Sequence, residues 1–267
     1  MSGNKRDALL RERTGRQERT ILILDYDGTL HDSMGIYEPA FRTAVSELEE
    51  RGWLEHREYS ADEIRHWIGF SAGDMWRSFQ PEFTPRQRET GSSRIGTLMT
   101  EAIRAGRARL YPGTEETLEI LSAAYELWFL SNCKISYMEA HRQMFGLDRW
   151  FGRYLCTEAY GFIAKEEILL QAADPDRRYI AVGDRAQDRQ MAGRTGIPFV
   201  GCAYGFGTPE ELAGADLCVE TVGQLPEACG SLQGKRVKHP DRSKKIKVLN
   251  IFEMSARCRP NSRKESL

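Results

Sequence analysis

Polar and acidic residues follow several apolar runs in this sequence, and their types could do chemistry together. The segment DYDGT (25–29) follows one run, SN (131–132) a second and GD (183–184) a third. Lys165 lies between the second and third segments, and Asp188 lies four residues after Asp184. If the runs are parallel strands, these groups meet beyond the carboxyl ends of the strands, where open parallel sheets bind their ligands.

The chemistry of this set follows from its oxygen atoms and charges. Crowded carboxylates repel one another and need a cation, and ligation by oxygen alone favours Mg²⁺ over zinc. Mg²⁺ held by a few carboxylates keeps waters and takes up a phosphate. Ser131, Thr29 and the backbone N–H groups around Gly28 can hydrogen-bond phosphate oxygens. Lys165 adds a compact positive charge that screens the anions.

Two aspartates separated by one residue, Asp25 and Asp27, allow a two-step reaction. A carboxylate beside a metal can act as a nucleophile and form an aspartyl-phosphate. A second carboxylate on the same turn can move a proton to or from the reacting oxygen. The spacing therefore predicts metal-dependent phosphoryl transfer.

The elements that must position these groups are short apolar strands alternating with helices of about ten residues, a pattern typical of a parallel sheet in an α/β protein. The expected strands are 20–25, Glu126–Leu130, Arg178–Val182, Pro198–Cys202 and Asp216–Val219. The expected helices between them are Thr114–Ala124, Ser136–Phe145, Lys165–Ala173, Ala186–Thr195 and Pro209–Leu212.

Residues 31–111 break this alternation and predict consecutive helices. The expected helices are Glu38–Arg51, Ala61–Trp67, Gly73–Phe79 and Pro85–Ala108. Ser60 followed by Glu63 is a capping box, and Thr84-Pro85 places a hydroxyl at an N-cap and proline at the first helical position. We therefore expect an all-helical domain at 31–111, inserted into a core formed by 20–30 and 112–230.

Charge is unevenly spread over the 267 residues, although the net charge is only −1. Residues 1–19 hold six basic and three acidic residues, and 234–267 hold eleven basic and three acidic residues. Both ends lack apolar periodicity, so we expect flexible extensions at 1–19 and 231–267 around an acidic body. Binding of the basic tail to a polyanion or a membrane surface stays open.

Composition excludes several classes of protein. A hydrophobic content of 40% excludes global disorder, and no apolar run approaches the 18 residues of a membrane span. The near-zero net charge gives no reason to expect specific nucleic-acid binding. No secretory signal is evident, and six scattered cysteines without a CxxC pair favour reduced thiols in a cytoplasmic protein.

The segment DYDGTLHDS (25–33) resembles the first motif of the haloacid dehalogenase (HAD) superfamily. SN (131–132), Lys165 and GDRAQD (183–188) resemble its second, third and fourth motifs, in the same order. The sequence is most similar to phosphoglycolate-phosphatase-like hydrolases, which insert a helical cap after the first motif. LYPGTEETLEIL (110–121) resembles the segment that returns from that cap to the core. The resemblance implies a Rossmann-like α/β core with a parallel sheet.

The resemblance also implies roles for individual residues. It implies a Mg²⁺-dependent phosphatase that hydrolyses a small soluble phosphomonoester, with cap opening and closing over the site. The implied catalytic residues are Asp25 as nucleophile, Asp27 as acid and base, Ser131 and Lys165. The implied phosphate-binding residues are Gly28, Thr29 and Asn132, and the implied metal ligands are Asp25, Asp27 through its backbone carbonyl, Asp184 and Asp188.

The sequence departs from the family pattern at its third motif, where Lys-Pro is usual and Glu166 follows Lys165. Of the 21 basic residues at 20–233, 19 are arginine and only Lys134 and Lys165 are lysine. A lysine at the expected position of the third motif favours Lys165, with Lys134 as the rival.

Two other functions stay open, a sugar-phosphate mutase of the same superfamily and a non-catalytic module that binds a phosphate ligand. Neither the identity of the ester nor an oligomeric state follows from the sequence. Six aromatic residues of the cap, Trp53, Trp67, Phe70, Trp76, Phe79 and Phe83, are expected in its core. By resemblance, the loop 69–74 reaches over the active site.

Overall fold

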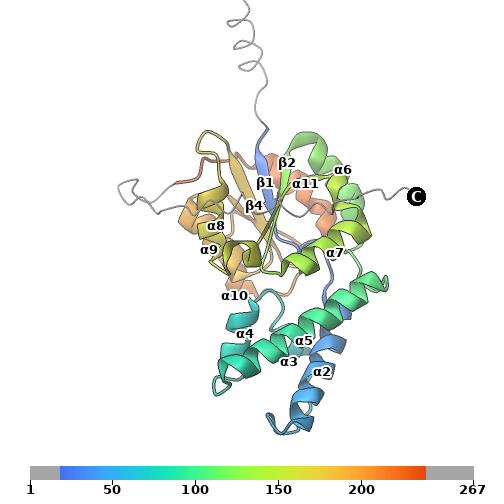
Figure 1. Cartoon of the computed structure of the whole chain (residues 1–267). Coiled ribbons are helices and arrows are strands. Elements are labelled where there is room, and N and C mark those ends of the chain that lie inside the picture. The colour runs from blue at the N-terminus through green and yellow to red at the C-terminus, as the bar shows by residue number, and fades with distance from the viewer. Residues whose placement is uncertain (1–18, 239–267) are drawn as a thin grey trace, which may run out of the picture.

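The computed structural model describes residues 19–238, whose centre is a six-stranded parallel sheet (Figure 1). The strands are β1 (Ile21–Leu24), β2 (Glu126–Ser131), β3 (Phe151–Cys156), β4 (Tyr179–Gly183), β5 (Phe199–Cys202) and β6 (Leu217–Val219). They lie in the order β3-β2-β1-β4-β5-β6. Because β1 lies between β2 and β4, the residues that follow these three strands are neighbours.

Helices cover both faces of the sheet. They are α6 (Thr114–Ala124), α7 (Ile135–Phe145), α8 (Lys165–Ala172), α9 (Ala186–Thr195), α10 (Pro209–Leu212) and α11 (Leu225–Ser231), with 3-10 turns η1 (Leu147–Arg149), η2 (Thr157–Tyr160) and η3 (Val222–Gln224). In Figure 1, α8 and α9 lie on one side of the sheet and α6, α7 and α11 on the other. Alternate residues of β1 point to opposite faces: Leu22 lies in a cluster with α6, α7 and α11, and Ile23 in a cluster with α8 and α9. Burial of both faces explains why the strands read as continuous apolar runs.

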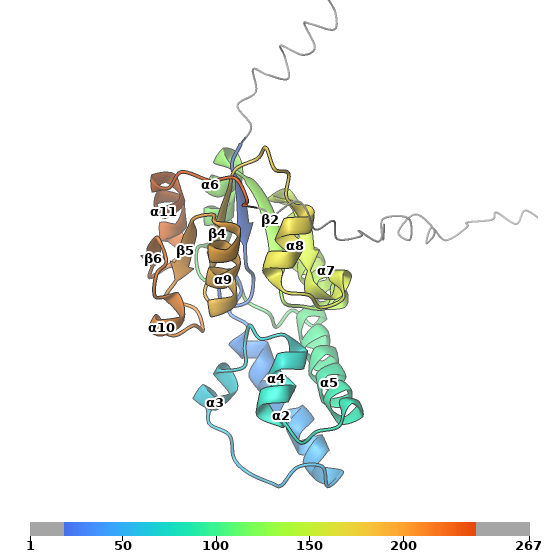
Figure 2. The ribbon, with the colours of Figure 1, turned by 90° about the vertical axis from the view of Figure 1, so that its left-hand side faces the viewer.

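The inserted cap consists of four helices between β1 and α6. They are α2 (Met34–Glu50), α3 (Ala61–Arg65), α4 (Ala72–Phe79) and α5 (Pro85–Arg104). The cap has its own apolar cluster, which includes Phe41, Trp76 and Ile103 and extends to Tyr137 of α7. Figure 2 shows α5 running from the cap toward α7 of the core. The predicted α/β core with an inserted helical cap is confirmed.

The helix starts in the cap follow local capping chemistry. The predicted capping box at Ser60 and Glu63 is present at the start of α3, and Thr84 caps α5 with Pro85 at its first position. α2 begins at Met34, four residues before the expected start at Glu38. Its first turns bury apolar side chains in the cap, and that tertiary packing outweighs the cost of a proline inside the helix.

The sheet has one strand more than the sequence predicts. β3 is an edge strand whose residues Gly152, Arg153 and Tyr154 are exposed or half-buried. Its sequence therefore lacks the continuous apolar run that marks the central strands. The short helix α11, with a proline near its start, was likewise not expected.

The basic C-terminal segment begins against the sheet. Lys235 forms an isolated antiparallel bridge with Tyr179 of β4, and Val237 is buried in the cluster with α8 and α9. Residues 231–238 of the extension expected at 231–267 therefore lie against the core. Residues 1–18 and 239–267 lie outside the described residues, so their flexibility stays a prediction. Within 19–238, no helix combines the length and apolar character that crossing a membrane requires.

Candidate active site

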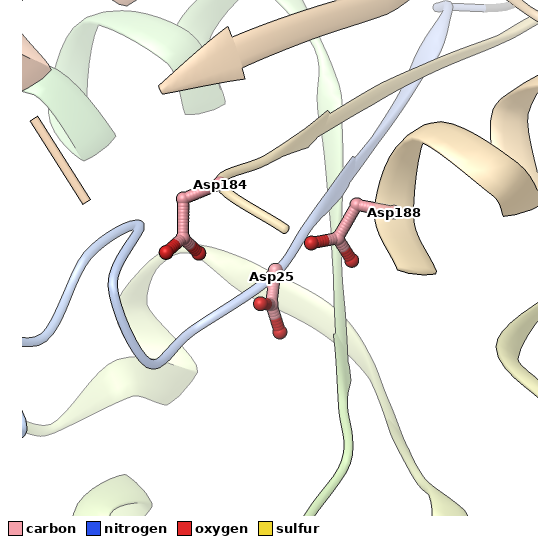
Figure 3. A group of neighbouring side chains, drawn as sticks. All are labelled: Asp25, Asp184 and Asp188. Atoms are coloured by element: carbon pink, nitrogen blue, oxygen red, sulfur yellow. The ribbon is translucent and has the colours of Figure 1, made fainter. Parts of the chain in front are cut away.

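Three buried aspartates meet at the carboxyl edge of the sheet. Asp25 directly follows β1, Asp184 directly follows β4, and Asp188 lies in the first turn of α9. Each offers a carboxylate oxygen that lies within 4.8 Å of the others (Figure 3). All three side chains are almost fully buried. The topology thus brings together three of the four predicted metal-binding residues through their side chains.

Lys165 is the cation in this cluster. Its Nζ lies 2.8 Å from Asp25 Oδ1 and 2.7 Å from Asp188 Oδ1, and it occupies the first position of α8. The rival Lys134 lies elsewhere, 3.9 Å from Glu89 and partly exposed. Three ionised carboxylates and one ammonium leave two negative charges uncompensated, which is the charge of one divalent cation. The all-oxygen donor set and this charge fit Mg²⁺.

Burial shapes the protonation of the cluster. Burial and the neighbouring Asp188 raise the pKa of Asp25 well above its usual value. The same two causes raise the pKa of Asp184 to about 7. Burial alone would lower the pKa of Lys165, but the nearby charges of Asp188 and Asp25 raise it instead, so the lysine stays charged. Without a cation, protons partly neutralise the carboxylates, and a bound cation would displace those protons.

This coupling predicts that Mg²⁺ stabilises the fold more at alkaline than at acidic pH. Because the pKa of Asp184 is raised from 3.8 to about 7 in the folded protein, the metal-free fold loses stability as pH rises between those values. Mg²⁺ binds the ionised form and offsets this loss. Thermal unfolding with and without Mg²⁺ should therefore show a larger rise in melting temperature at pH 8 than at pH 5.5. Equal rises at both pH values would contradict the account.

Gly28 and Thr29 lie against Asp184. Thr29 Oγ1 donates to Asp184 Oδ1 at 3.2 Å, and the Phe206 backbone N–H donates to Oδ2 at 2.7 Å. Gly28 has a φ of +85°, and a Cβ at this position would lie 2.2 Å from Asp184 Oδ2. Thr29 and the Phe206 N–H therefore orient Asp184, and Gly28 leaves room for its carboxylate. Neither Gly28 nor Thr29 lines the cavity described below. Thr29 was expected to contact a phosphate, but in this structure its side chain contacts Asp184 instead.

Asp27 is held apart from the carboxylate cluster by two core residues. His31 Nδ1 lies 2.7 Å from Asp27 Oδ1, and the Tyr137 hydroxyl donates to the same oxygen at 2.7 Å. Asp27 keeps 17% of its side chain exposed, whereas His31 is fully buried. Neither partner was singled out from the sequence. His31 lies inside the segment DYDGTLHDS, but Tyr137 is 110 residues away from Asp27 and only folding brings it there.

A cavity of about 140 Å³ lies between the core and the cap. Asp25, Asp27, Ser131 and Asn132 line it from the core, and side chains of the loop before α4, of α4 and of α5 line it from the cap. Four of the predicted site residues therefore share one cavity between the core and the cap. A phosphomonoester in this cavity would lie against the two aspartates of the first segment.

Hydrogen bonds to backbone carbonyls hold the cap against the core. Asn132 Nδ2 donates to the Gly69 carbonyl at 3.1 Å, and the buried Arg185 donates to the Ile68 carbonyl. Arg185 also donates to Glu211 Oε2 at 2.8 Å. Asn132, expected to bind phosphate, thus contacts the cap loop. Arg185 was not expected at the site, although it directly follows Asp184.

With this geometry in place, comparison with known proteins decides the family. Residues 20–196, more than half of the chain, match the family model of haloacid dehalogenase-like hydrolases. The chain belongs to the haloacid dehalogenase-like hydrolase family. The predicted family and the predicted enzyme class, a HAD-type phosphoric monoester hydrolase, are confirmed.

One sequence relative and two solved structures match most of this chain. A phosphoglycolate phosphatase from Agrobacterium fabrum (strain C58) is 26% identical over 205 residues, which are 72% of this chain and 84% of that protein. A predicted phosphatase from Clostridium acetobutylicum has a TM-score of 0.70 at 20% identity, covering 81% of this chain and 100% of that one. A predicted phosphoglycolate phosphatase from Haemophilus somnus 129pt has a TM-score of 0.64 at 22% identity, with 80% and 100% covered.

Glu166, where the HAD pattern usually has proline, has a structural explanation. Its side chain is buried and accepts a hydrogen bond from Arg194 at 2.8 Å. Glu166 also lies in the first turn of α8, where a negative charge is favoured. The pair ties α8 to α9, the two helices that carry Lys165 and Asp188. The replacement of proline by Glu166 therefore keeps Lys165 in the position that the HAD pattern gives it.

Proposed function

We propose that this HAD enzyme is a Mg²⁺-dependent phosphatase that hydrolyses a small soluble phosphomonoester through an aspartyl-phosphate on Asp25. The observation that carries the proposal is the buried cluster of three aspartates and Lys165 beside a cavity lined by Asp25, Asp27 and Ser131. We further propose that the enzyme acts in the cytoplasm. The described cysteines are free, in keeping with a reducing compartment.

The metal would be held by the side chains of Asp25, Asp184 and Asp188 and by the backbone carbonyl of Asp27. When bound, Mg²⁺ supplies positive charge that draws electron density from the phosphoryl oxygens. The buried Thr29 and the Phe206 backbone N–H fix the orientation of Asp184 before any ligand arrives. This preorganisation supports a site built for a cation rather than a chance group of acids.

In the first step, an oxygen of Asp25 attacks phosphorus and the bond from phosphorus to the alcohol oxygen breaks. Asp27 gives its proton to that oxygen, so the alcohol leaves neutral. In the second step, Asp27 takes a proton from a water that attacks the phosphorus. The Asp25–phosphorus bond then breaks, and phosphate and the Asp25 carboxylate are released. Tyr137 and His31 hold one oxygen of Asp27, which leaves the other available for the proton.

Two further residues would stabilise charge during transfer. Ser131 ends β2 beside β1 and lines the cavity, so its hydroxyl can donate to a phosphoryl oxygen. Lys165 contacts Asp25 directly and offsets the negative charge that the nucleophile and the phosphoryl group bring together. A screen of phosphomonoesters for phosphate release with Mg²⁺ or with EDTA tests the proposal. Isomerised sugar phosphate without free phosphate would instead indicate a mutase.

Removing the Tyr137 hydroxyl should affect poor leaving groups more than good ones. In the Tyr137→Phe variant, Asp27 loses a hydrogen bond of 2.7 Å and delivers its proton less well. We expect kcat to fall roughly tenfold for an alkyl phosphate, which needs protonation, and much less for p-nitrophenyl phosphate, which does not. Tyr160→Phe, a matched change in η2, should alter neither. An equal fall in kcat for both substrates would show that Tyr137 has only a structural role.

A further inference from the structure

Besides the catalytic aspartates, the cavity is lined largely by apolar side chains, together with the hydroxyls of Ser92, Thr100 and Ser136. Ile68, Met75, Ile95 and Met99 line it from the cap, together with Phe70. We propose, on the basis of the proposed phosphatase function, that the substrate is the phosphate monoester of a small apolar alcohol rather than an ester that carries a second anionic group. The alcohol portion would lie against these five residues, which are referred to below as the apolar wall.

The charged residues of the lining support this assignment. Within the described residues, the charged side chains that line the cavity are Asp25, Asp27 and Lys134. The two aspartates face the phosphoryl group in the proposed reaction and would repel a second anion. A carboxylate placed against the apolar wall would lose its hydration, and the five side chains of that wall offer it no hydrogen-bond donor. An alkyl or aryl group gains free energy from the same burial.

Two arginines that hold the cap to the core, Arg185 and Arg65, already have partners. Arg185 donates to Glu211 at 2.8 Å and to the Ile68 carbonyl, and its guanidinium lies 5.1 Å from the centre of the Phe70 ring. Arg65 donates to the Gly205 carbonyl at 2.5 Å. Neither lines the cavity. Lys134 does line it, but its ammonium also lies 3.9 Å from Glu89, so Lys134 is the residue to examine if an acidic substrate is preferred.

The size of the cavity limits the alcohol. A dry apolar cavity of about 150 Å³ holds one benzene molecule in another protein, and this cavity measures about 140 Å³. Since the phosphoryl group takes part of the space, the alcohol portion should contain only a few carbon atoms. Propyl and isobutyl phosphate are the appropriate probes.

The test compares propyl phosphate with phosphoglycolate, two esters of similar length in which the P–O–CH₂ group carries an ethyl or a carboxylate group. We expect kcat/KM to be at least tenfold higher for propyl phosphate. A preference for phosphoglycolate would overturn the proposal while leaving the phosphatase function intact, provided p-nitrophenyl phosphate is hydrolysed with Mg²⁺. If none of these esters releases phosphate, the proposed function fails and the substrate proposal fails with it.

Two variants sharpen this comparison. Met99→Lys places a cation in the apolar wall, so we expect the ratio of kcat/KM for propyl phosphate to that for phosphoglycolate to fall at least tenfold. The matched control Ile120→Lys, on the exposed surface of α6, should leave both rates unchanged. If Met99→Lys does not fold, Met99→Ala provides a second test, since the larger cavity should favour pentyl over propyl phosphate. If Met99→Ala ranks the alkyl esters by kcat/KM in the same order as the native protein, the proposal is overturned. It is also overturned if the native protein prefers phosphoglycolate and Lys134→Met abolishes that preference.

Discussion

The Asp25→Asn variant is expected to lose phosphatase activity by roughly 10⁴-fold or more while keeping its fold. The amide has nearly the same shape as the carboxylate but cannot form an acyl phosphate under these conditions. Burial and Asp188 already disfavour a negative charge at this position, so the neutral amide should not lower the melting temperature of the metal-free protein. Phosphate release and thermal unfolding measure the two effects separately.

The control for Asp25→Asn is Asp62→Asn, at an exposed position in the first turn of α3. This variant should retain the activity of the native protein. Normal turnover by Asp25→Asn would exclude Asp25 as the nucleophile. A large loss of stability in Asp25→Asn would instead show that the carboxylate is needed for folding, which the buried cluster does not require.

The Lys165→Met variant should lose both activity and stability. Lys165 is the ammonium that contacts two buried carboxylates, at 2.8 and 2.7 Å. Without it, Asp25 and Asp188 are buried with no cation, which costs about 3–5 kcal/mol in the metal-free protein. Activity should fall roughly 10²–10³-fold, because charge on the phosphoryl group is no longer offset.

Added Mg²⁺ should restore part of the stability of Lys165→Met, since a divalent cation compensates the same carboxylates, but it should not restore the activity. The matched control is Lys134→Met. Lys134 is partly exposed, and its contact with Glu89 is long, so the stability should change by less than about 1 kcal/mol. Equal stabilities of the two methionine variants would contradict the assignment of Lys165 to the buried cluster.

The central strands were predictable because strands that are buried on both faces must be apolar throughout. β1 is buried on both faces, so its four residues are all apolar, and the acidic residues begin where the strand ends. β3 was not predictable on this basis. It lies at the sheet edge with Gly152 and Arg153 in its middle, and its place depends on pairing with β2.

Some residues of the site were likewise predictable from the sequence, and others were not. Asp25, Asp184 and Lys165 follow from their positions at strand ends and helix starts, which topology alone brings together. The contacts of Asp27 with Tyr137 and of Arg185 with the cap join residues more than 100 positions apart. No local pattern encodes such pairs. Thr29 shows the same limit, because its residue type allowed a phosphate contact and its packing directs the hydroxyl to Asp184.

For the aromatic residues of the cap, packing decides which lie in the core of the cap and which line the cavity. Trp76 and Phe83 stack at 5.7 Å inside the cap, as the sequence suggests for core residues. Phe70 is half-buried, lines the cavity and lies beneath Arg185. The sequence does not separate the two kinds of position, since Phe83 and Phe70 both lie in loops next to helix starts. Only the closed arrangement of cap and core separates them.

The most direct test of the proposed mechanism is to identify the phosphorylated residue. The Asp27→Asn variant should form the aspartyl-phosphate from a good leaving group but hydrolyse it slowly, because the base that activates water is missing. After acid quench of a reaction with Mg²⁺ and p-nitrophenyl phosphate, borohydride reduction and peptide mass spectrometry should place the modification on Asp25. Phosphate release with no modified peptide, or a modification on a different residue, would contradict the account.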